Sequence, residues 1–252
     1  MEESRIVLAL QPIVRADKQS TYGYEILSRV LTPEGVRGPL EYAQHHGWAH
    51  CDMEVGQLLK CWMEGRLRAY NRPLFLNLSA PTMASDDHFQ AWSECLKLLV
   101  REKPEGIVIE MSEEVTDEDL DRRWDQVCAL GARIAMDDLG ASEPTRERAE
   151  RFAWDLCKIE MPSELFRLHK DTCLPHLKPG AEFIVECIET DSEAIKACEV
   201  GVSLQQGFFF ARPKVLNTSI AITPIESHVP REARMAYGQL CDLLINERRI
   251  AQ

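Results

Sequence analysis

The sequence predicts an α/β protein of the TIM-like (β/α)8-barrel class, with an antiparallel first pair of strands. The chain has 252 residues, and a barrel of this class typically needs about 250. Short apolar runs alternate with helix-like stretches, which is typical of βα units around a parallel sheet. We expect the barrel to occupy residues 1–213.

Eight apolar runs are the candidate strands. Only six residues, RADKQS, separate the first two runs, and this is too short for the crossover that parallel strands require. The first two runs therefore predict a hairpin. In chain order, the eight runs span residues 5–14, 21–30, 73–80, 106–113, 132–140, 155–160, 182–189 and 203–213.

Helix-like segments follow the later runs. Ser85 or Asp86 is the candidate N-cap of the first segment, and Asp191 or Ser192 is the candidate N-cap of the last. Gly131 is a helix stop signal at the end of the second segment. The predicted helical segments span residues 86–103, 117–131, 145–156, 163–177 and 191–201.

The composition indicates a folded protein with few nonspecific partners. Hydrophobic residues make up 45% and charged residues 28%, close to the average for soluble domains. The formal net charge of −12 argues against broad binding to DNA or to anionic membranes. The nine cysteines include no CxxC pair, and no stretch reaches about 18 apolar residues. We expect no signal peptide, because the first residues are acidic and the apolar run that follows is short. We therefore expect a cytoplasmic protein without membrane insertion.

Polar and charged side chains stand at the ends of most predicted strands. Strand C-termini meet at the face of a barrel where active sites lie. A helix cap or half of a salt bridge would explain any one of these residues, but chance does not readily explain the whole set. The set comprises Glu25 with Arg29, Asn77, Glu110 with Glu113, Asp137 with Asp138, Lys158, Glu186 with Glu189, and Gln206.

The carboxylates of this set predict a metal centre. Several carboxylates in one pocket would repel one another unless cations neutralise them. Oxygen ligands with an asparagine amide favour Mg²⁺ or Mn²⁺ over zinc. The adjacent Asp137 and Asp138 follow an apolar run, and neighbouring side chains there can reach two ions about 4 Å apart. The sequence therefore predicts a two-metal site.

Eight short motifs resemble those of a known family. QPIV, YEILSR, NLS, EMSE, DDLG, CKIE, ECIET and QQGFFFARP lie in this order between Leu8 and Pro213. In order and approximate spacing they resemble the EAL domain family of bacterial cyclic di-GMP phosphodiesterases. The resemblance implies a barrel that hydrolyses cyclic di-GMP to linear pGpG with two Mg²⁺ or Mn²⁺ ions. It also implies a homodimer.

Matching motif by motif gives the residue roles that the resemblance implies. Lys158 resembles the cation that holds the attacking water or the developing phosphate charge, and Glu186 resembles the general base. Together with Glu25 they are the implied catalytic residues. The implied metal ligands are Glu25, Asn77, Glu110 and Asp137 for the first ion, and Asp137, Asp138 and Glu186 for the second. The implied substrate contacts are Arg29, Gln11, Leu27 and Gln206, and the implied supporting residues are Glu113 and Glu189.

The sequence departs from the family pattern at two important places. The signature reads EIL, which keeps Glu25 and Leu27 but adds bulk at Ile26. After Asp138 the chain reads LGASEPTRERAERF, where the family has a loop that couples the metal site to dimerisation. Two other functions therefore stay open. One is a module that binds cyclic di-GMP or a protein as a sensor, and the other is a metal-dependent barrel enzyme acting on another phosphoester or a sugar.

Residues 214–252 extend beyond the predicted barrel. TPIESHVP reads as a linker, and Met235, Leu240, Leu243 and Leu244 recur at helical spacing. We expect an amphipathic helix that packs on the barrel or lies at an interface, where it would bind a protein partner.

Overall fold

The computed structural model describes residues 4–18, 20–65, 72–103, 106–139, 143–160 and 179–216. The chain divides into two compact units. Unit 1 comprises Met1–Leu10, Glu25–Ile134 and Pro213–Ile220, and unit 2 comprises Gln11–Tyr24, Ala135–Arg212 and Ala221–Gln252. Strands β1 (Arg5–Arg15) and β2 (Ser20–Thr32) contribute residues to both units.

The strand pairing has the topology of a closed barrel. The sheet order is β10-β1-β9-β8-β7-β6-β5-β4-β2-β3, and β1 also pairs with β2. The short 3-10 turn η1 (Ala16–Lys18) joins β1 to β2, so this pair is a hairpin, as the sequence predicted. The other strands are β3 (Gly35–Arg37), β4 (Leu74–Leu78), β5 (Ile107–Met111), β6 (Arg133–Met136), β7 (Leu156–Glu160), β8 (Glu182–Glu186), β9 (Leu204–Gln205) and β10 (Lys214–Val215).

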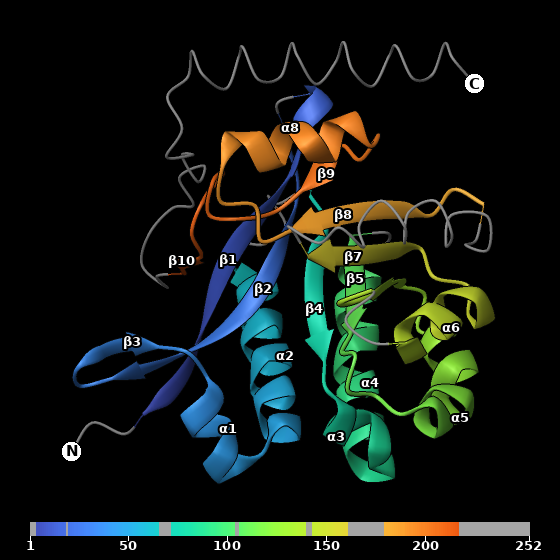
Figure 1. The fold of residues 1–252 in the computed structure, drawn as a ribbon. Helices are drawn as coiled ribbons and strands as arrows, with labels where there is room; N and C mark the ends of the chain where they lie inside the picture. The colour runs from blue at the N-terminus through green and yellow to red at the C-terminus, as the bar shows by residue number, and fades with distance from the viewer. Residues whose placement is uncertain are drawn as a thin grey trace. The chain divides into compact units, whose positions relative to one another are not determined.

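Unit 1 contains the first five α-helices. Helix α2 lies beside α4, and α3 lies against α2, α4 and α5 (Figure 1). Gly47 ends α1 with φ 88°, a conformation that glycine adopts without strain, and α2 starts at the next residue. The helices are α1 (Leu40–His46), α2 (Trp48–Gly65), α3 (Ala80–Ala84), α4 (Asp86–Glu102) and α5 (Asp117–Cys128).

Unit 2 is built on parallel strands. Strand β7 pairs in parallel with β6 and β8, and β8 pairs in parallel with β9. In the part of unit 2 that the structure describes, the helices are α6 (Glu143–Arg151) and α8 (Asp191–Glu199). Helix α8 begins with a capping box in which Thr190 and Glu193 each bind the other's backbone N–H.

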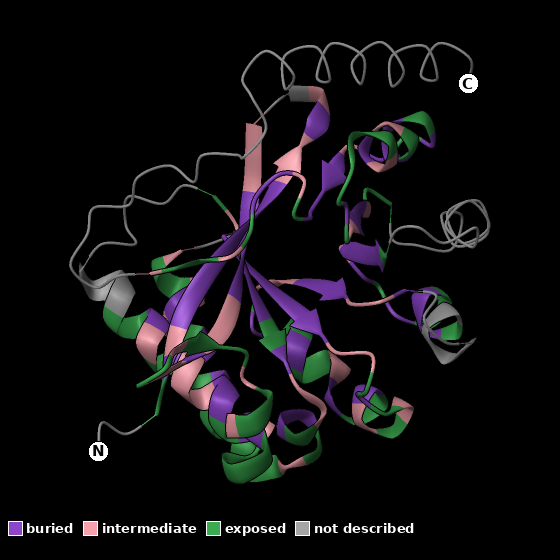
Figure 2. Ribbon diagram, turned by 60° about the vertical axis from the view of Figure 1, so that its left-hand side comes forward, coloured by how far each residue is buried: buried purple, intermediate pink, exposed green. Residues whose placement is uncertain are grey.

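Burial follows the strands. In Figure 2 the buried residues gather on the strands and most exposed residues lie on the helices. Strand β2 also has many half-buried residues, and β3 and β10 have no buried residue. Strands β4 and β5 carry runs of fully buried residues, as expected for parallel strands covered on both faces. Among the described residues, no helix is long and apolar enough to cross a membrane.

Several element boundaries differ from the sequence prediction. The predicted strand 203–213 pairs only at β9, because the chain turns at Gly207 and the backbone N–H of Phe209 bonds to Ile188 O. The predicted helix 145–156 ends at Arg151. Thr190, and neither Asp191 nor Ser192, caps α8. Helices α1 and α3 and strand β3 were not predicted, and for α2 only helix-like segments around Trp48 and Trp62 were expected, without bounds. The segment 163–177 and the tail beyond 216 lie outside the described residues.

Gly207→Ala should strongly destabilise the fold. A Cβ at this position would lie 2.1 Å from Ile188 O and 2.4 Å from Ile188 N. These are backbone atoms that cannot turn aside, so we expect a loss of about 3 kcal/mol in the free energy of unfolding. Urea unfolding followed by circular dichroism measures the loss. Gly38→Ala is the control, since a Cβ there has no heavy atom within 4 Å. Equal midpoints for both variants would contradict the expectation.

Candidate functional site

Three of the predicted metal ligands lie together in unit 1. Asn77 in β4 stands directly opposite Glu110 in β5 in the parallel register. Asn77 Nδ2 donates a hydrogen bond to Glu25 Oε1 over 3.1 Å. Glu25 and Glu110 are both buried, and Glu110 is 0% exposed. The parallel pairing of β4 and β5 therefore places an amide opposite a carboxylate, and the hydrogen bond from Asn77 adds the carboxylate of Glu25.

A cavity of about 300 Å³ lies in unit 1 beside this group. Leu27 and Arg29 from β2, Asn77 from β4 and Glu113 after β5 all line it, so it contains four of the residues predicted from the sequence. The remaining lining residues are Ile26, Ser28, Pro39, Trp48, Cys51, Asp52, Val55, Leu78, Ser79, Ser112 and Glu114. The lining combines a guanidinium, carboxylates and apolar groups, which is suited to a ligand with a phosphate and a flat ring.

Arg29 supplies the positive charge of this cavity. Its Nη1 donates to the carbonyl oxygen of Ser28 over 2.8 Å. Partial burial lowers the pKa of Arg29, and the negative charge of Glu25 opposes this change. A guanidinium remains protonated at neutral pH despite such a shift. Arg29 is therefore a cation available to a phosphate in the cavity.

Asp52 is a buried acid in the cavity wall. Its Oδ2 accepts hydrogen bonds from Ser79 N at 3.1 Å, Ser79 Oγ at 2.6 Å and Thr82 Oγ1 at 2.5 Å. Burial raises the pKa of Asp52, while these hydrogen bonds act in the opposite direction. Asp52 on α2 thus ties this helix to the turn that follows β4.

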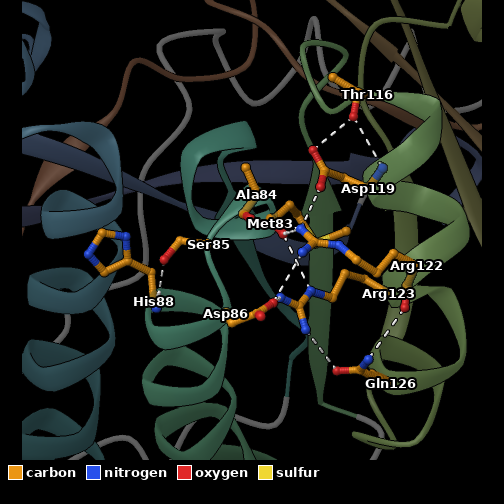
Figure 3. A network of polar contacts seen from close by, with 10 residues as sticks. All are labelled: Met83, Ala84, Ser85, Asp86, His88, Thr116, Asp119, Arg122, Arg123 and Gln126. Carbon is orange, nitrogen blue, oxygen red and sulfur yellow. Dashed lines mark hydrogen bonds and ion pairs between the residues drawn. The ribbon is translucent and has the colours of Figure 1, made fainter.

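Two arginines of α5 hold the other end of α3, the short helix that follows Ser79. Figure 3 shows the guanidinium groups of Arg122 and Arg123 directed at the C-terminus of α3 and the start of α4. Arg122 donates to the carbonyl oxygens of Met83 and Ala84 over 3.0 and 2.7 Å. Both arginines bind Asp86 Oδ1. Helix α3 is consequently fixed between these arginines and Asp52.

The predicted catalytic lysine lies in unit 2 between two acids. Lys158 Nζ is 2.7 Å from Glu186 Oε1 and 3.2 Å from Asp137 Oδ1. Lys158 is 1% exposed, and a buried ammonium needs partners of opposite charge. The structure therefore brings Lys158, Glu186 and Asp137 into contact.

The backbone after β6 orients the paired aspartates. Asp138 has φ 49°, a left-handed conformation that aspartate tolerates better than most residues. The next residue, Leu139, donates its N–H to Lys158 O over 2.9 Å, which fixes the turn to β7. Asp137 and Asp138 each offer a carboxylate oxygen, and the two oxygens lie within 4.8 Å of each other.

Among the described residues, Cys187 joins Asp138 as a non-glycine residue with a left-handed backbone, at φ 54°. Its Sγ donates to Glu160 Oε1 at a distance of 3.6 Å. Burial, together with the charges of Glu160 and Glu186, raises the pKa of Cys187 to about 12. The thiol therefore stays protonated at neutral pH and is a poor nucleophile.

The remaining predicted residues of unit 2 have structural contacts. Gln11 Nε2 donates to Ala211 O over 3.4 Å. The backbone of Gln206 bonds to Val185 O and Ile188 N. Glu189 is exposed, and its N–H binds the capping carboxylate of Glu193. The predicted roles of Gln11, Gln206 and Glu189 in binding or support stay predictions.

The donor groups fit hard divalent cations. In unit 1, Asn77 donates through its amide nitrogen, which keeps its carbonyl oxygen as a ligand atom beside two glutamates. In unit 2, Asp137 and Asp138 offer carboxylate oxygens close to each other, and Glu186, the third predicted ligand, places its Oε1 against Lys158 Nζ. Oxygen donors of this kind suit Mg²⁺ or Mn²⁺.

Sequence reasoning missed Asp52, Trp48 and Cys51. They come from α2, whose bounds were not predicted although Trp48 and Trp62 were expected in helix-like segments, and no strand end marks them. Ser79 belongs to the motif NLS but had no assigned role. A charged residue flanked by Cys51 and Met53 was the only available signal for Asp52, and it is too weak to identify a buried carboxylate.

Comparisons with known proteins point to one family. A family model described as EAL domain matches residues 1–213. The chain is 24% identical to the probable cyclic di-GMP phosphodiesterase PdeA of Escherichia coli, over 86% of this chain and 31% of PdeA. It spans less than a third of the length of the first curated relatives that it matches.

Two solved structures share the fold. YkuI of Bacillus subtilis, with an EAL domain and in complex with cyclic di-GMP and calcium, aligns with a TM-score of 0.73 at 21% identity, over 98% of this chain and 63% of that chain. BlrP1 of Klebsiella pneumoniae, in a complex with manganese and cyclic di-GMP, aligns with a TM-score of 0.68 at 24% identity, over 85% and 57%. These similarities support the TIM-like barrel that the sequence predicted.

Asp52→Asn should change how stability depends on pH. Because burial raises the pKa of Asp52, the unfolded chain releases this proton at lower pH than the folded chain does. The stability of the wild type relative to Asp52→Asn should therefore be highest below about pH 4. It should fall as the pH rises through the folded-state pKa. Urea unfolding from pH 3.5 to 8 measures this difference. A difference that grows with pH would show that the hydrogen bonds outweigh burial.

Proposed function

Because the chain belongs to the EAL domain family, we propose that it hydrolyses cyclic di-GMP to linear pGpG. The observation that carries this proposal is Lys158, buried and held between Glu186 at 2.7 Å and Asp137 at 3.2 Å. A lysine in this setting serves to neutralise the charge that develops on a phosphodiester. The cyclic di-GMP complexes of YkuI and BlrP1 support the choice of substrate.

The proposal assigns two Mg²⁺ or Mn²⁺ ions to the carboxylates. Glu25, Asn77, Glu110 and Asp137 would hold the first ion, and Asp137, Asp138 and Glu186 the second. The bound ions would lower the pKa of a water molecule and offset phosphate charge. Calcium and manganese in the related complexes support divalent metal use.

The protein's own side chains then transfer the proton and bind the substrate. Glu186 accepts the proton of the attacking water, and Lys158, 2.7 Å from it, holds the carboxylate in place. Arg29 binds a substrate phosphate in the cavity while Leu27 contacts the ligand beside it. Gln11 and Gln206 complete the substrate contacts, and Glu113 and Glu189 support the loops. We also propose that the protein acts as a homodimer.

A binding module without catalysis is the second candidate. The cavity with Arg29, Leu27 and Asp52 is lined by residues of unit 1 alone. Lys158 and Glu186, which belong to unit 2, are not among the residues that line this cavity. A chain with impaired catalysis would therefore retain this ligand-binding surface and act as a sensor.

Purified protein should convert cyclic di-GMP to pGpG in the presence of Mg²⁺ or Mn²⁺, and chelation with EDTA should stop the reaction. Glu25→Ala should lower the rate by a factor of about 100 or more, since it removes a ligand and the partner of Asn77. Timed chromatography of the nucleotide products measures both effects. Glu102→Ala, an exposed acid at the end of α4, is the matched control and should retain the wild-type rate.

The same assay separates the candidate functions. If the assay detects no product but calorimetry detects tight binding of cyclic di-GMP, the sensor is supported and hydrolysis is overturned. Hydrolysis of a different phosphoester alone would support the other metal-dependent barrel enzyme. If the experiments detect no product and no binding, both cyclic di-GMP proposals are overturned.

Lys158→Met should affect catalysis more than ligand binding. The apolar side chain has a similar length but cannot offset charge, so we expect kcat to fall by about 100-fold or more. Because the cavity of unit 1 does not include Lys158, the affinity for cyclic di-GMP measured with Ca²⁺ should change by less than about threefold. Equal losses in affinity and kcat would assign Lys158 to ligand binding instead.

A further inference from the structure

The hydroxyl of Ser79 binds a distant carboxylate and does not cap the helix that it precedes. Ser79 is the N-cap residue of α3, and a serine there commonly accepts a hydrogen bond from a backbone N–H of the first turn. Ser79 makes no such bond. Its Oγ donates to Asp52 Oδ2 over 2.6 Å, and its backbone N–H donates to the same oxygen over 3.1 Å. Both donors of Ser79 are thus directed at one carboxylate of α2.

Asp52 holds these donors from a fixed position. It is 9% exposed, and its Oδ2 also accepts a hydrogen bond from Thr82 Oγ1 over 2.5 Å. Helix α2, which carries Asp52, lies against α3 and α4. A buried carboxylate that leaves its donors loses hydrogen bonds that water does not replace. The position of Asp52 therefore restrains the backbone at Ser79.

This restraint acts on the end of β4, two residues after Asn77. Asn77 is exposed, while its neighbours Leu76 and Leu78 are buried. Packing around its side chain therefore contributes little, and the placement of its amide depends on the backbone of the strand end. That backbone is bound at two points. Leu78 O accepts a hydrogen bond from Ser112 N over 3.3 Å, and Ser79 N donates to Asp52.

We propose that Asp52 is a positioning residue for the first metal ion. Through Ser79 it holds the end of β4, so that the amide of Asn77 stays opposite Glu110 and within hydrogen-bonding distance of Glu25. Asp52 itself touches neither the ion nor the reacting atoms. The inference rests on the metal ligands of the proposed function. Partners that orient metal ligands typically change metal affinity by about 10-fold to 100-fold when they are removed.

The first test measures Mn²⁺ binding without nucleotide, by electron paramagnetic resonance of the free ion. Asp52→Ala and Ser79→Ala should each raise the dissociation constant about 10-fold. Thr82→Val is the matched control, because it removes a hydrogen bond to the same carboxylate but lies inside α3, away from the end of β4. It should change the dissociation constant by less than about twofold. Circular dichroism and urea unfolding show whether each variant is folded at the assay temperature.

A double-mutant cycle separates positioning from general destabilisation. In an Asn77→Ala background, Asp52→Ala should have no further effect on Mn²⁺ affinity, because the ligand that it positions is already gone. A general loss of packing would lower the affinity by the same factor in both backgrounds. Equal factors would therefore overturn the proposal, even if Asp52→Ala alone weakens Mn²⁺ binding.

The remaining outcomes also decide the question. Unchanged Mn²⁺ affinity in Asp52→Ala and Ser79→Ala would overturn the proposal, and so would an equal loss in Thr82→Val. If Asp52→Ala weakens binding of cyclic di-GMP measured with Ca²⁺ but leaves Mn²⁺ affinity unchanged, Asp52 is a ligand contact and has no positioning role.

The binding experiments distinguish this proposal from the proposed function, because they involve no turnover. Coupling between Asp52 and Asn77 would support the positioning role even if the protein forms no pGpG. Conversely, pGpG formation together with equal factors in the cycle would leave the proposed function intact and overturn the positioning role alone.

Discussion

The buried ammonium of Lys158 is the constraint on which the arrangement of unit 2 depends. A lysine that is 1% exposed loses its hydration, and only nearby anions compensate for this loss. Glu186 at the end of β8 and Asp137 after β6 supply them from the two strands that flank β7. Parallel pairing is what makes this possible, because three consecutive strand ends then lie side by side. The same charges that stabilise the lysine are those that divalent ions require.

In unit 1 the buried charge is the carboxylate of Asp52, and hydrogen bonds compensate for its lost hydration. Asp52 is buried and accepts three hydrogen bonds from Ser79 and Thr82. Ser79 precedes α3 and Thr82 lies within it, and Arg122 and Arg123 of α5 bind the other end of this helix and the start of α4 (Figure 3). The cavity wall is thus held in position by side chains that lie far apart in the sequence. This explains why a cavity lined by α2 has a defined shape beside Asn77.

The strands and their polar ends were predictable from the sequence, because buried parallel strands leave an unbroken apolar run with a polar stop. Asn77 and Glu110 follow this pattern, and the register of β4 and β5 places them opposite each other. The first helices were not predictable in the same way. The segment from Leu40 to Gly65 contains three histidines and a central glycine, which obscure its helical period. Asp52 was missed with it, since burial of a carboxylate depends on Ser79, which is distant in sequence.

The backbone conformations at Asp138 and Cys187 explain why hydrophobic periodicity does not predict the backbone near the site, while short sequence motifs identify its residues. Both residues have positive φ values, 49° and 54°, where a regular strand would continue with negative ones. Such conformations are costly for residues other than glycine and persist only where surrounding contacts fix them. At Asp138 the fixing contact is the hydrogen bond from Leu139 to Lys158 O. The turn that directs an acid toward its neighbour is therefore determined by the strand that carries the lysine. If Asp137 and Asp138 hold metal as proposed, a change in the loop after Asp138, such as the departure at LGASEPTRERAERF, would act on them through backbone geometry without replacing either residue.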